Sequence, residues 1–167
     1  MGQVVEAKRP LVRDAGEGEA LWFRENHMTI KVSAADSGGA FSLVESWVKA
    51  NTGPPLHVHH REEETLWVLS GRVRIRCGDD EFTVGPGAMA VLPRDVPHAF
   101  HVEGEETAHL LTLMTPGGGE ALFARHGRPA GGPGLPPPSA PDIEGMKRIG
   151  EQLGQEILGP PMAVSGL

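Results

Sequence analysis

Between residues 20 and 115 the chain is divided into short apolar runs by turns rich in glycine and proline, such as the one at Gly71. These runs recur at intervals of roughly 8–12 residues, a spacing typical of antiparallel strands. Met28, Ile30 and Val32 alternate with polar neighbours, as expected for a strand with one buried face. We therefore predict an all-β fold, a small antiparallel β-barrel or jelly roll, and not an alternating β/α fold.

The composition changes abruptly at Pro116. Of the 26 residues from 116 to 141, 14 are glycine or proline, so this stretch is predicted to be a linker with room for one short helix near Glu120–His126. Apolar residues then recur at helical spacing after Asp142, a good N-cap. The predicted parts are therefore an N-terminal arm (1–19), the β-barrel (20–115), the linker (116–141) and a C-terminal helix and tail (142–167).

Charge and composition exclude several classes of protein. The formal net charge is −7 and no basic run stands out, so we expect no nucleic-acid partner. Cys77 is the only cysteine, which excludes an intrachain disulfide and a cysteine-ligated zinc cluster. No apolar run is long enough to span a bilayer, and Met1–Ala20 has no apolar signal core. We therefore expect no membrane partner and a cytoplasmic location.

Eight histidines in 167 residues are the strongest compositional signal, and two of them begin a distinctive segment. On an extended chain His57 and His59 point to the same side, where two imidazoles can share one metal ion. A short turn after them can bring Glu64 back to that side. Glu64 heads a stripe with Leu66 and Val68 that we interpret as inward-facing, where an unpaired carboxylate would be costly. A metal ion between these groups would remove that cost.

A second segment places another histidine at the start of a strand. Pro93 and Pro97 bracket a tight loop, and His98 follows at once, on the same face as Phe100. In a closed sheet His98 can lie beside the first two histidines.

The two segments resemble the two sequence motifs of the cupin family. The first motif is written as a glycine, five residues, His-x-His, three or four residues, Glu, six residues and Gly. Here it runs from His57 and His59 through Glu64 to Gly71, although only three residues separate Gly53 from His57 instead of five.

The second cupin motif is usually Gly, five residues, Pro-x-Gly, two residues, His, three residues and Asn. Here Gly87, Pro93 and His98 match it, whereas Asp95 replaces the loop glycine and Val102 replaces the asparagine. These departures leave every ligand position in place. They bear on the shape of the loop and on the polarity around the site.

The resemblance implies four metal ligands, namely His57, His59, Glu64 and His98. Three imidazoles and a carboxylate suit one divalent transition metal ion, such as Fe, Ni, Mn, Co, Cu or Zn. An octahedral ion would keep two positions for water, substrate or dioxygen. Glu64 is also the candidate catalytic residue, either as a ligand or as a base.

Inward apolar side chains would favour an apolar or aromatic small-molecule substrate. The candidate pocket residues are Leu66, Val68, Phe100 and His109. We expect Leu111 and Leu113 to share the inward face with His109.

The resemblance further points to bacterial single-domain cupins described as quercetin dioxygenase-like. We therefore expect a metal-dependent oxidoreductase, a dioxygenase of a small phenolic or enolisable compound. A metal-dependent isomerase, cyclase or lyase would use the same site without dioxygen, and a small-molecule-binding cupin would bind without turnover.

The strand of Trp67 and Leu69 is apolar on both faces, and a small barrel can bury only one of them. The other face must be covered by the N-terminal segment, the C-terminal helix or a second subunit. We expect a second subunit in a symmetric homodimer, the commonest closed assembly. His60 and His101 have the outward parity and are predicted at the surface or in that interface. Glu62 and Glu63 are predicted to be solvated turn residues.

Overall fold

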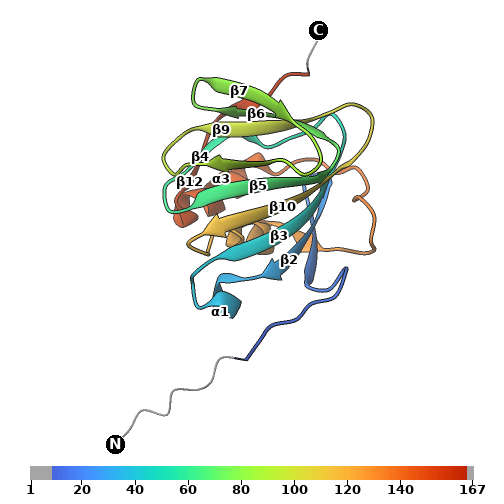
Figure 1. Cartoon of the computed structure of the whole chain (residues 1–167), viewed down its shortest axis with the longest axis vertical. Coiled ribbons are helices and arrows are strands. Elements are labelled where there is room, and N and C mark those ends of the chain that lie inside the picture. Colours follow the sequence, from blue (N-terminus) through green and yellow to red (C-terminus); the bar gives the residue numbers. More distant parts are fainter. Residues whose placement is uncertain (1–8, 165–167) are drawn as a thin grey trace, which may run out of the picture.

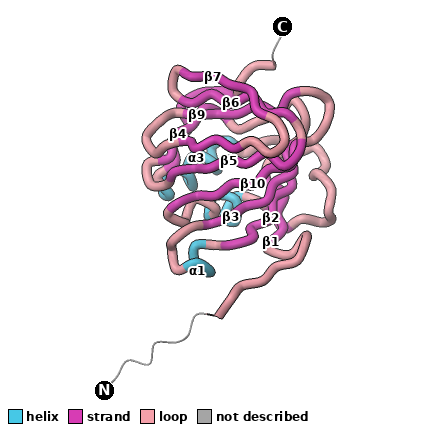
Figure 2. The backbone as a smooth tube through the Cα atoms, viewed as in Figure 1, coloured by secondary structure: helices cyan, strands magenta, loops and turns pink. Residues whose placement is uncertain are grey.

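The computed structural model describes residues 9–164 as two antiparallel sheets packed face to face, with short helices at the margins (Figure 1). The larger sheet has seven strands in the order β11-β1-β2-β3-β10-β5-β8, and the smaller has five in the order β12-β4-β9-β6-β7. Strands are the main regular structure of the chain, and the helices are few and short (Figure 2). The predicted all-β jelly roll is therefore confirmed, although within these residues the sheets do not close into a barrel.

The strands of the larger sheet are β1 (Glu19–Phe23), β2 (Asn26–Val32), β3 (Ser42–Val48), β5 (Glu63–Ser70), β8 (Met89–Leu92), β10 (Ala108–Thr115) and β11 (Arg128–Pro129). Those of the smaller sheet are β4 (Pro55–His59), β6 (Arg72–Cys77), β7 (Asp80–Val84), β9 (His98–Glu103) and β12 (Gln155–Pro161). The helices are α1 (Ala34–Ser37), α2 (Ala121–His126) and α3 (Ile143–Leu153). None of the helices among the described residues has the length and apolar character needed to cross a membrane.

The two-residue period of the strands decides which side chains enter the space between the sheets. In β5, Glu64, Leu66 and Val68 are buried, as the sequence predicts. Leu66 and Val68 pack with residues of the smaller sheet such as Val73 and Ile75 in one apolar cluster. Burying a side chain of this kind is worth about 1.5–3 kcal/mol, so this cluster holds the two sheets together.

A second apolar cluster lies where the helices meet the larger sheet. It contains Phe23, Met28 and Met114, with Met146 of α3, and Phe123 of α2 packs against it. Phe23 and Phe123 meet edge to face with ring centroids 5.0 Å apart. The helices thereby cover one part of the interior that the strands alone would leave open.

The C-terminal segment differs from the prediction. The helix ends at Leu153 because Gly154 adopts a φ of 77°, a left-handed conformation that suits a glycine C-cap. The chain then forms β12, whose Ile157 pairs with His57 of β4. Strand β12 supplies one of the two neighbours of β4, so the tail is part of the sheet and not only a helical appendage.

The outer face of the larger sheet exposes large apolar side chains. Trp67 and Leu69 of β5 are 49% and 38% exposed, and Met89 and Val91 of the neighbouring β8 are 53% and 54% exposed. Trp47 of β3 is 41% exposed. A contiguous apolar face of this kind is typical of an interaction surface, and the homodimer stays a prediction.

We expect the protein to sediment as a dimer at micromolar concentration and the double variant Trp67→Glu, Val91→Glu to sediment as a monomer. Charges placed on the apolar face would have to be desolvated in the interface. Sedimentation velocity measures the outcome. Phe82→Glu, on β7 of the other sheet and 38% exposed, is the matched control and should leave the dimer intact. A monomeric wild-type protein would contradict the prediction.

Candidate metal centre

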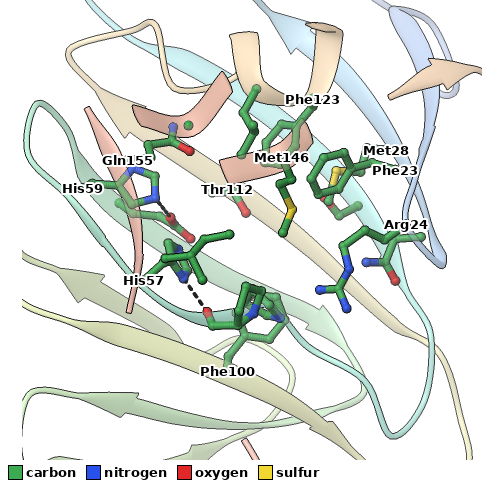
Figure 3. Close-up of a pocket in the computed structure, with 18 of the residues that line it drawn as sticks. Phe23, Arg24, Met28, His57, His59, Phe100, Thr112, Phe123, Met146 and Gln155 are labelled. Atoms are coloured by element: carbon green, nitrogen blue, oxygen red, sulfur yellow. Dashed lines mark hydrogen bonds and ion pairs between the residues drawn. The ribbon is translucent and has the colours of Figure 1, made fainter. Parts of the chain in front are cut away.

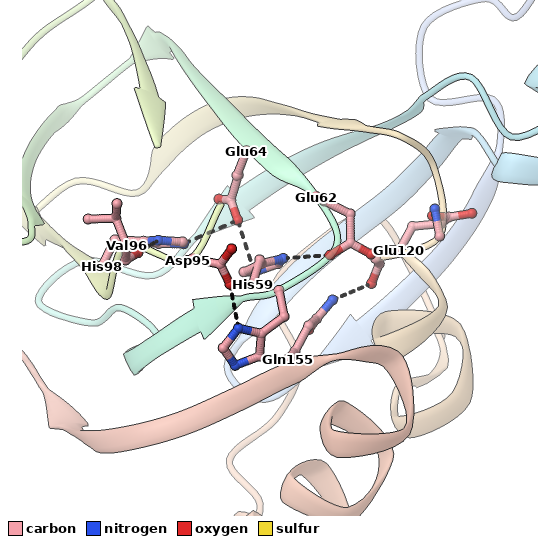
Figure 4. Close-up of polar contacts among 11 residues, drawn as sticks. His59, Glu62, Glu64, Asp95, Val96, His98, Glu120 and Gln155 are labelled. Carbon is pink, nitrogen blue, oxygen red and sulfur yellow. Dashed lines mark hydrogen bonds and ion pairs between the residues drawn. The ribbon is translucent and has the colours of Figure 1, made fainter. Parts of the chain in front are cut away.

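The side chains of His57, His59, Glu64 and His98 converge, with one possible ligand atom from each lying within 4.8 Å of the others. The two histidines of the first segment lie on β4, Glu64 lies on β5, and His98 lies on β9 opposite His57. Figure 4 shows Glu64 between His59 and His98. Three ligand positions therefore come from the smaller sheet and the fourth from the larger sheet.

In the loop before His98, Asp95 stands where the second cupin motif usually has a glycine. Asp95 adopts a φ of 64°, in the left-handed region that glycine favours and aspartate tolerates. Its backbone N–H donates to the His59 carbonyl at 2.9 Å. Its carboxylate lies 2.7 Å from His60 Nδ1, which raises the pKa of His60. Asp95 thus preserves the loop conformation and ties the loop to β4.

Backbone carbonyls orient two of the histidine rings. Nδ1 of His57 donates to the Pro55 carbonyl at 2.8 Å, and Nδ1 of His98 donates to the Val96 carbonyl at 2.9 Å. A carbonyl can only accept, so Nδ1 carries the proton and each neutral ring has its free lone pair on Nε2. This is the tautomer that a metal ligand requires at Nε2.

Glu62 orients the third ring, which the sequence did not predict. It is only 3% exposed, and its Oε2 lies 3.3 Å from Nδ1 of His59. The prediction of a solvated turn residue is therefore wrong, because the turn between β4 and β5 directs this carboxylate inward. Its position three residues after a candidate ligand is the one signal that the sequence offers. A carboxylate on the far nitrogen of a ligating histidine raises the basicity of the ligand.

The electrostatics of the cluster favour an anionic Glu64 among imidazoles. Burial opposes its ionisation, but the close approach of His98 and the charges of the neighbouring histidines lower the pKa of Glu64 to about 2. Burial lowers the pKa of His57 to about 3, so this ring is neutral at physiological pH. Burial would also lower the pKa of His98, but the nearby carboxylate of Glu64 outweighs this effect and raises that pKa.

The residues fit a divalent transition metal ion. Nε2 of His98 is buried without a hydrogen-bond partner, although buried polar atoms are normally satisfied. It lies 3.7 Å from Oε2 of Glu64, which is 3.3 Å from Nε2 of His59. Imidazole nitrogens and a carboxylate oxygen are ligands suited to such an ion. An ion among them would satisfy the orphaned nitrogen.

A pocket opens directly from this cluster (Figure 3). Phe100 lines it, as predicted, together with Leu110 and Thr112 of β10. Most of the remaining lining comes from segments outside the predicted β region or near its start, including Phe23, Leu122, Phe123, Met146, Gln155 and Ile157. The sequence did not connect these segments with the site, because only the packing of the helices and of β12 brings them there.

Three of the predicted pocket residues lie elsewhere. Leu66 and Val68 are fully buried in the core between the sheets and do not line the pocket. His109 lies on the outer side of β10, where it stacks on Trp47 at 3.9 Å and bonds Glu45 at 2.7 Å. Both faces of β10 carry apolar residues, so its sequence does not indicate which face is buried. In the structure Leu110 faces inward, and His109, Leu111 and Leu113 lie on the opposite face.

The two histidines predicted at the surface have different environments. His60 is exposed and bonds Asp95. His101 is only 2% exposed, so the surface prediction is wrong for it. The loop before β4 lies against β9 here, since a Cβ on Gly53 would come within 3.2 Å of the His101 Cα. Outward parity on β9 therefore does not mean contact with solvent.

Comparisons with known proteins agree with the fold described above. Residues 45–114 match the family profile of the cupin domain. Quercetin 2,3-dioxygenase of Bacillus subtilis (strain 168) is 25% identical over 122 residues, which are 73% of this chain but only 36% of that enzyme.

An oxalate decarboxylase variant from Bacillus subtilis superposes with a TM-score of 0.53 at 20% identity, over 66% of this chain and 31% of the other. The structure of KdgF from Halomonas sp. superposes with a TM-score of 0.52 at 15% identity, over 58% of this chain and 84% of KdgF. At these identities the two structures show a shared fold.

We expect the wild-type protein to bind one divalent ion per chain and His98→Ala to bind substoichiometrically. His98→Ala removes one of four converging ligand atoms. Elemental analysis after dialysis measures the stoichiometry. His60→Ala is the control, because this exposed side chain points away from the cluster, and it should retain one ion. Equal metal content in the wild type and His98→Ala would contradict the assignment.

We expect Glu62→Gln to weaken metal affinity by about 10–100-fold, as is typical when the partner of a ligating histidine is changed. The amide oxygen can still accept the His59 proton, but the negative charge is lost. Competition with a chromophoric chelator measures the affinity. Glu63→Gln alters the neighbouring residue, which is exposed and pairs with Arg94, and it should leave the affinity unchanged. A similar loss in both variants would count against a specific role for Glu62.

Proposed function

Because residues 45–114 match the family model of the cupin domain, we propose that this protein is a metal-dependent oxidoreductase, a dioxygenase of a small phenolic or enolisable compound. The observation that carries the proposal is the convergence of four candidate metal ligands, three of which, His57, His59 and Glu64, also line an otherwise largely apolar pocket. The quercetin 2,3-dioxygenase of Bacillus subtilis, 25% identical over 73% of the chain, supports the oxidative reaction over the alternatives.

Four ligands from the chain suit a catalytic site. A divalent ion held by three neutral imidazoles and the Glu64 carboxylate keeps a net charge of +1, and an octahedral ion keeps open positions. When bound, such an ion lowers the pKa of a coordinated hydroxyl group and stabilises the enolate that results. A compound with adjacent hydroxyl or carbonyl oxygens can occupy the open positions.

The other residues of the pocket orient the substrate and exclude water. Phe100, Leu110 and Met146 provide apolar walls for the body of the molecule. Water excluded from this space strengthens the electrostatic interactions near the ligands. Glu64 is the only carboxylate among the four converging side chains, so we propose that it holds the metal and can receive the proton of the substrate hydroxyl.

The reaction balances with dioxygen as the second substrate. For an enediol, the carbon–carbon double bond and the O–O bond break, and each carbon gains one oxygen atom. One enediol and one dioxygen thus give two carboxylic acids. The carbon atoms lose four electrons in total and dioxygen accepts four.

We expect the Fe- or Ni-loaded protein to consume dioxygen when given flavonols or small enediols, and we expect no turnover under nitrogen. An oxygen electrode and mass spectrometry with 18O2 measure consumption and incorporation. Glu64→Gln should lower turnover by at least about tenfold, since general-base contributions are typically 10²–10⁴-fold. Turnover that continues without oxygen would replace the proposal with an isomerase or lyase. Tight binding without turnover would favour a binding protein.

A further inference from the structure

We propose that Arg24 selects the substrate of this pocket by binding a carboxylate at the end away from the metal ligands. The substrate class is then a small aromatic or enolisable carboxylic acid. This inference rests on the proposed function only in placing the substrate in the same pocket. The recognition of an anion by Arg24 does not require dioxygen chemistry.

The position of Arg24 in the pocket is the first observation. Its side chain extends from the turn between β1 and β2 into the pocket, across from His57 and near Phe100 (Figure 3). The side chain is only 13% exposed. Among the described residues that line the pocket, Arg24 is the only arginine or lysine.

Arg24 is anchored to the segment that carries the metal ligands. Its Nη1 donates to the Gly53 carbonyl at 3.1 Å. Gly53 itself lies against β9, where a Cβ would come within 1.9 Å of the Phe100 carbonyl oxygen, so only glycine fits. The chain continues from Gly53 through two prolines into β4 and His57. The guanidinium is therefore held at a defined position relative to the ligand cluster.

Most hydrogen-bond donors of Arg24 are unused. A guanidinium has five N–H donors, and the Nη1 bond to Gly53 is the only hydrogen bond that Arg24 makes to the described residues. Nε is buried without a hydrogen-bond partner, and its nearest carboxylate oxygen, Oε2 of Glu25, lies 3.6 Å away. Half-satisfied buried charges are costly. A carboxylate in the pocket would accept bonds from the free donors.

The backbone conformation at position 24 does not favour arginine. The reason for an arginine at this position must therefore lie in its side chain. Phe23 and Asn26 pair across a two-residue hairpin turn, and Arg24 adopts a φ of 54° as its first central residue. Both preferred types of this turn require positive φ at that position and favour Gly, Asn or Asp. An arginine costs conformational free energy there.

The charges and walls of the pocket define the ligand. A divalent ion and its four ligand residues would together carry a charge of +1, and Glu62 behind His59 and Glu156 in the pocket lining add negative charge at that end. Arg24 places a positive charge at the other end, where Oε2 of Glu25 lies 3.6 Å from its Nε. The space between these two ends is lined by apolar side chains such as Phe23, Met28 and Phe123. A ligand with metal-binding oxygens, an apolar middle and a terminal carboxylate matches all three parts.

The test compares two probes that differ in one carboxylate, 3,4-dihydroxybenzoate and catechol. The full-length protein is loaded with Zn²⁺, which has no redox chemistry, and binding is measured by isothermal titration calorimetry with zinc content checked afterwards. We expect the wild type to bind 3,4-dihydroxybenzoate at least about tenfold more tightly than catechol, the gain expected from charge-assisted hydrogen bonds. Arg24→Gly should abolish this preference and leave catechol affinity unchanged.

Controls separate recognition from folding and from net charge. Arg24→Gly relieves the positive φ, so its Tm should equal or exceed that of the wild type. Arg24→Lys should keep part of the preference, because it retains the charge but not the fork of donors. Arg72→Gln removes a charge from an exposed arginine of β6 that pairs with Glu103, and it should retain the full preference.

Equal affinities for the two probes in the wild type would overturn the inference. So would a preference that survives in Arg24→Gly, or a wild type that does not bind 3,4-dihydroxybenzoate. None of these measurements involves dioxygen. A protein that consumes no oxygen can still show the preference that depends on Arg24, and an active dioxygenase can lack it.

Discussion

Everything in this structure that bears on function depends on how three imidazole rings are held. Each ring is fixed through Nδ1, by the Pro55 carbonyl, the Val96 carbonyl or the Glu62 carboxylate. The three Nε2 atoms then face Glu64, the only member of the cluster on the larger sheet. A metal ion here would connect the two sheets of the sandwich. Stability of the sandwich and geometry of the site are therefore coupled.

The C-terminal segment has a larger part in the site than its place in the chain suggests. Strand β12 pairs with β4 so that Gln155 lies opposite His59 and Ile157 opposite His57. Both residues also line the pocket. The same segment thus completes the sheet around the ligand strand and shapes the space next to it, while α2 and α3 cover the remaining side.

Three described residues other than glycine adopt positive φ, namely Arg24, Asn51 and Asp95, and the first and last of them lie beside the site. At both of these positions, Arg24 and Asp95, a glycine would adopt the same backbone conformation at a lower cost in conformational free energy. Asp95 ties its loop to β4 through His59 and His60, and Arg24 reaches into the pocket. Residues commonly depart from local backbone preference where their side chains are needed for function. Arg24 bonds Gly53 just before β4, and the Asp95 carboxylate bonds His60 just after it.

The order of residues was enough to predict the all-β class and the inward parity of Glu64, because strand periodicity and motif spacing are local properties. Periodicity could not say which parity of β10 faces inward, since both are apolar, and His109 was misplaced for that reason. It also could not foresee that Glu62 turns toward His59, that His101 is covered, or that the tail adds β12. These features depend on contacts between segments far apart in the chain, which only the packed tertiary structure decides.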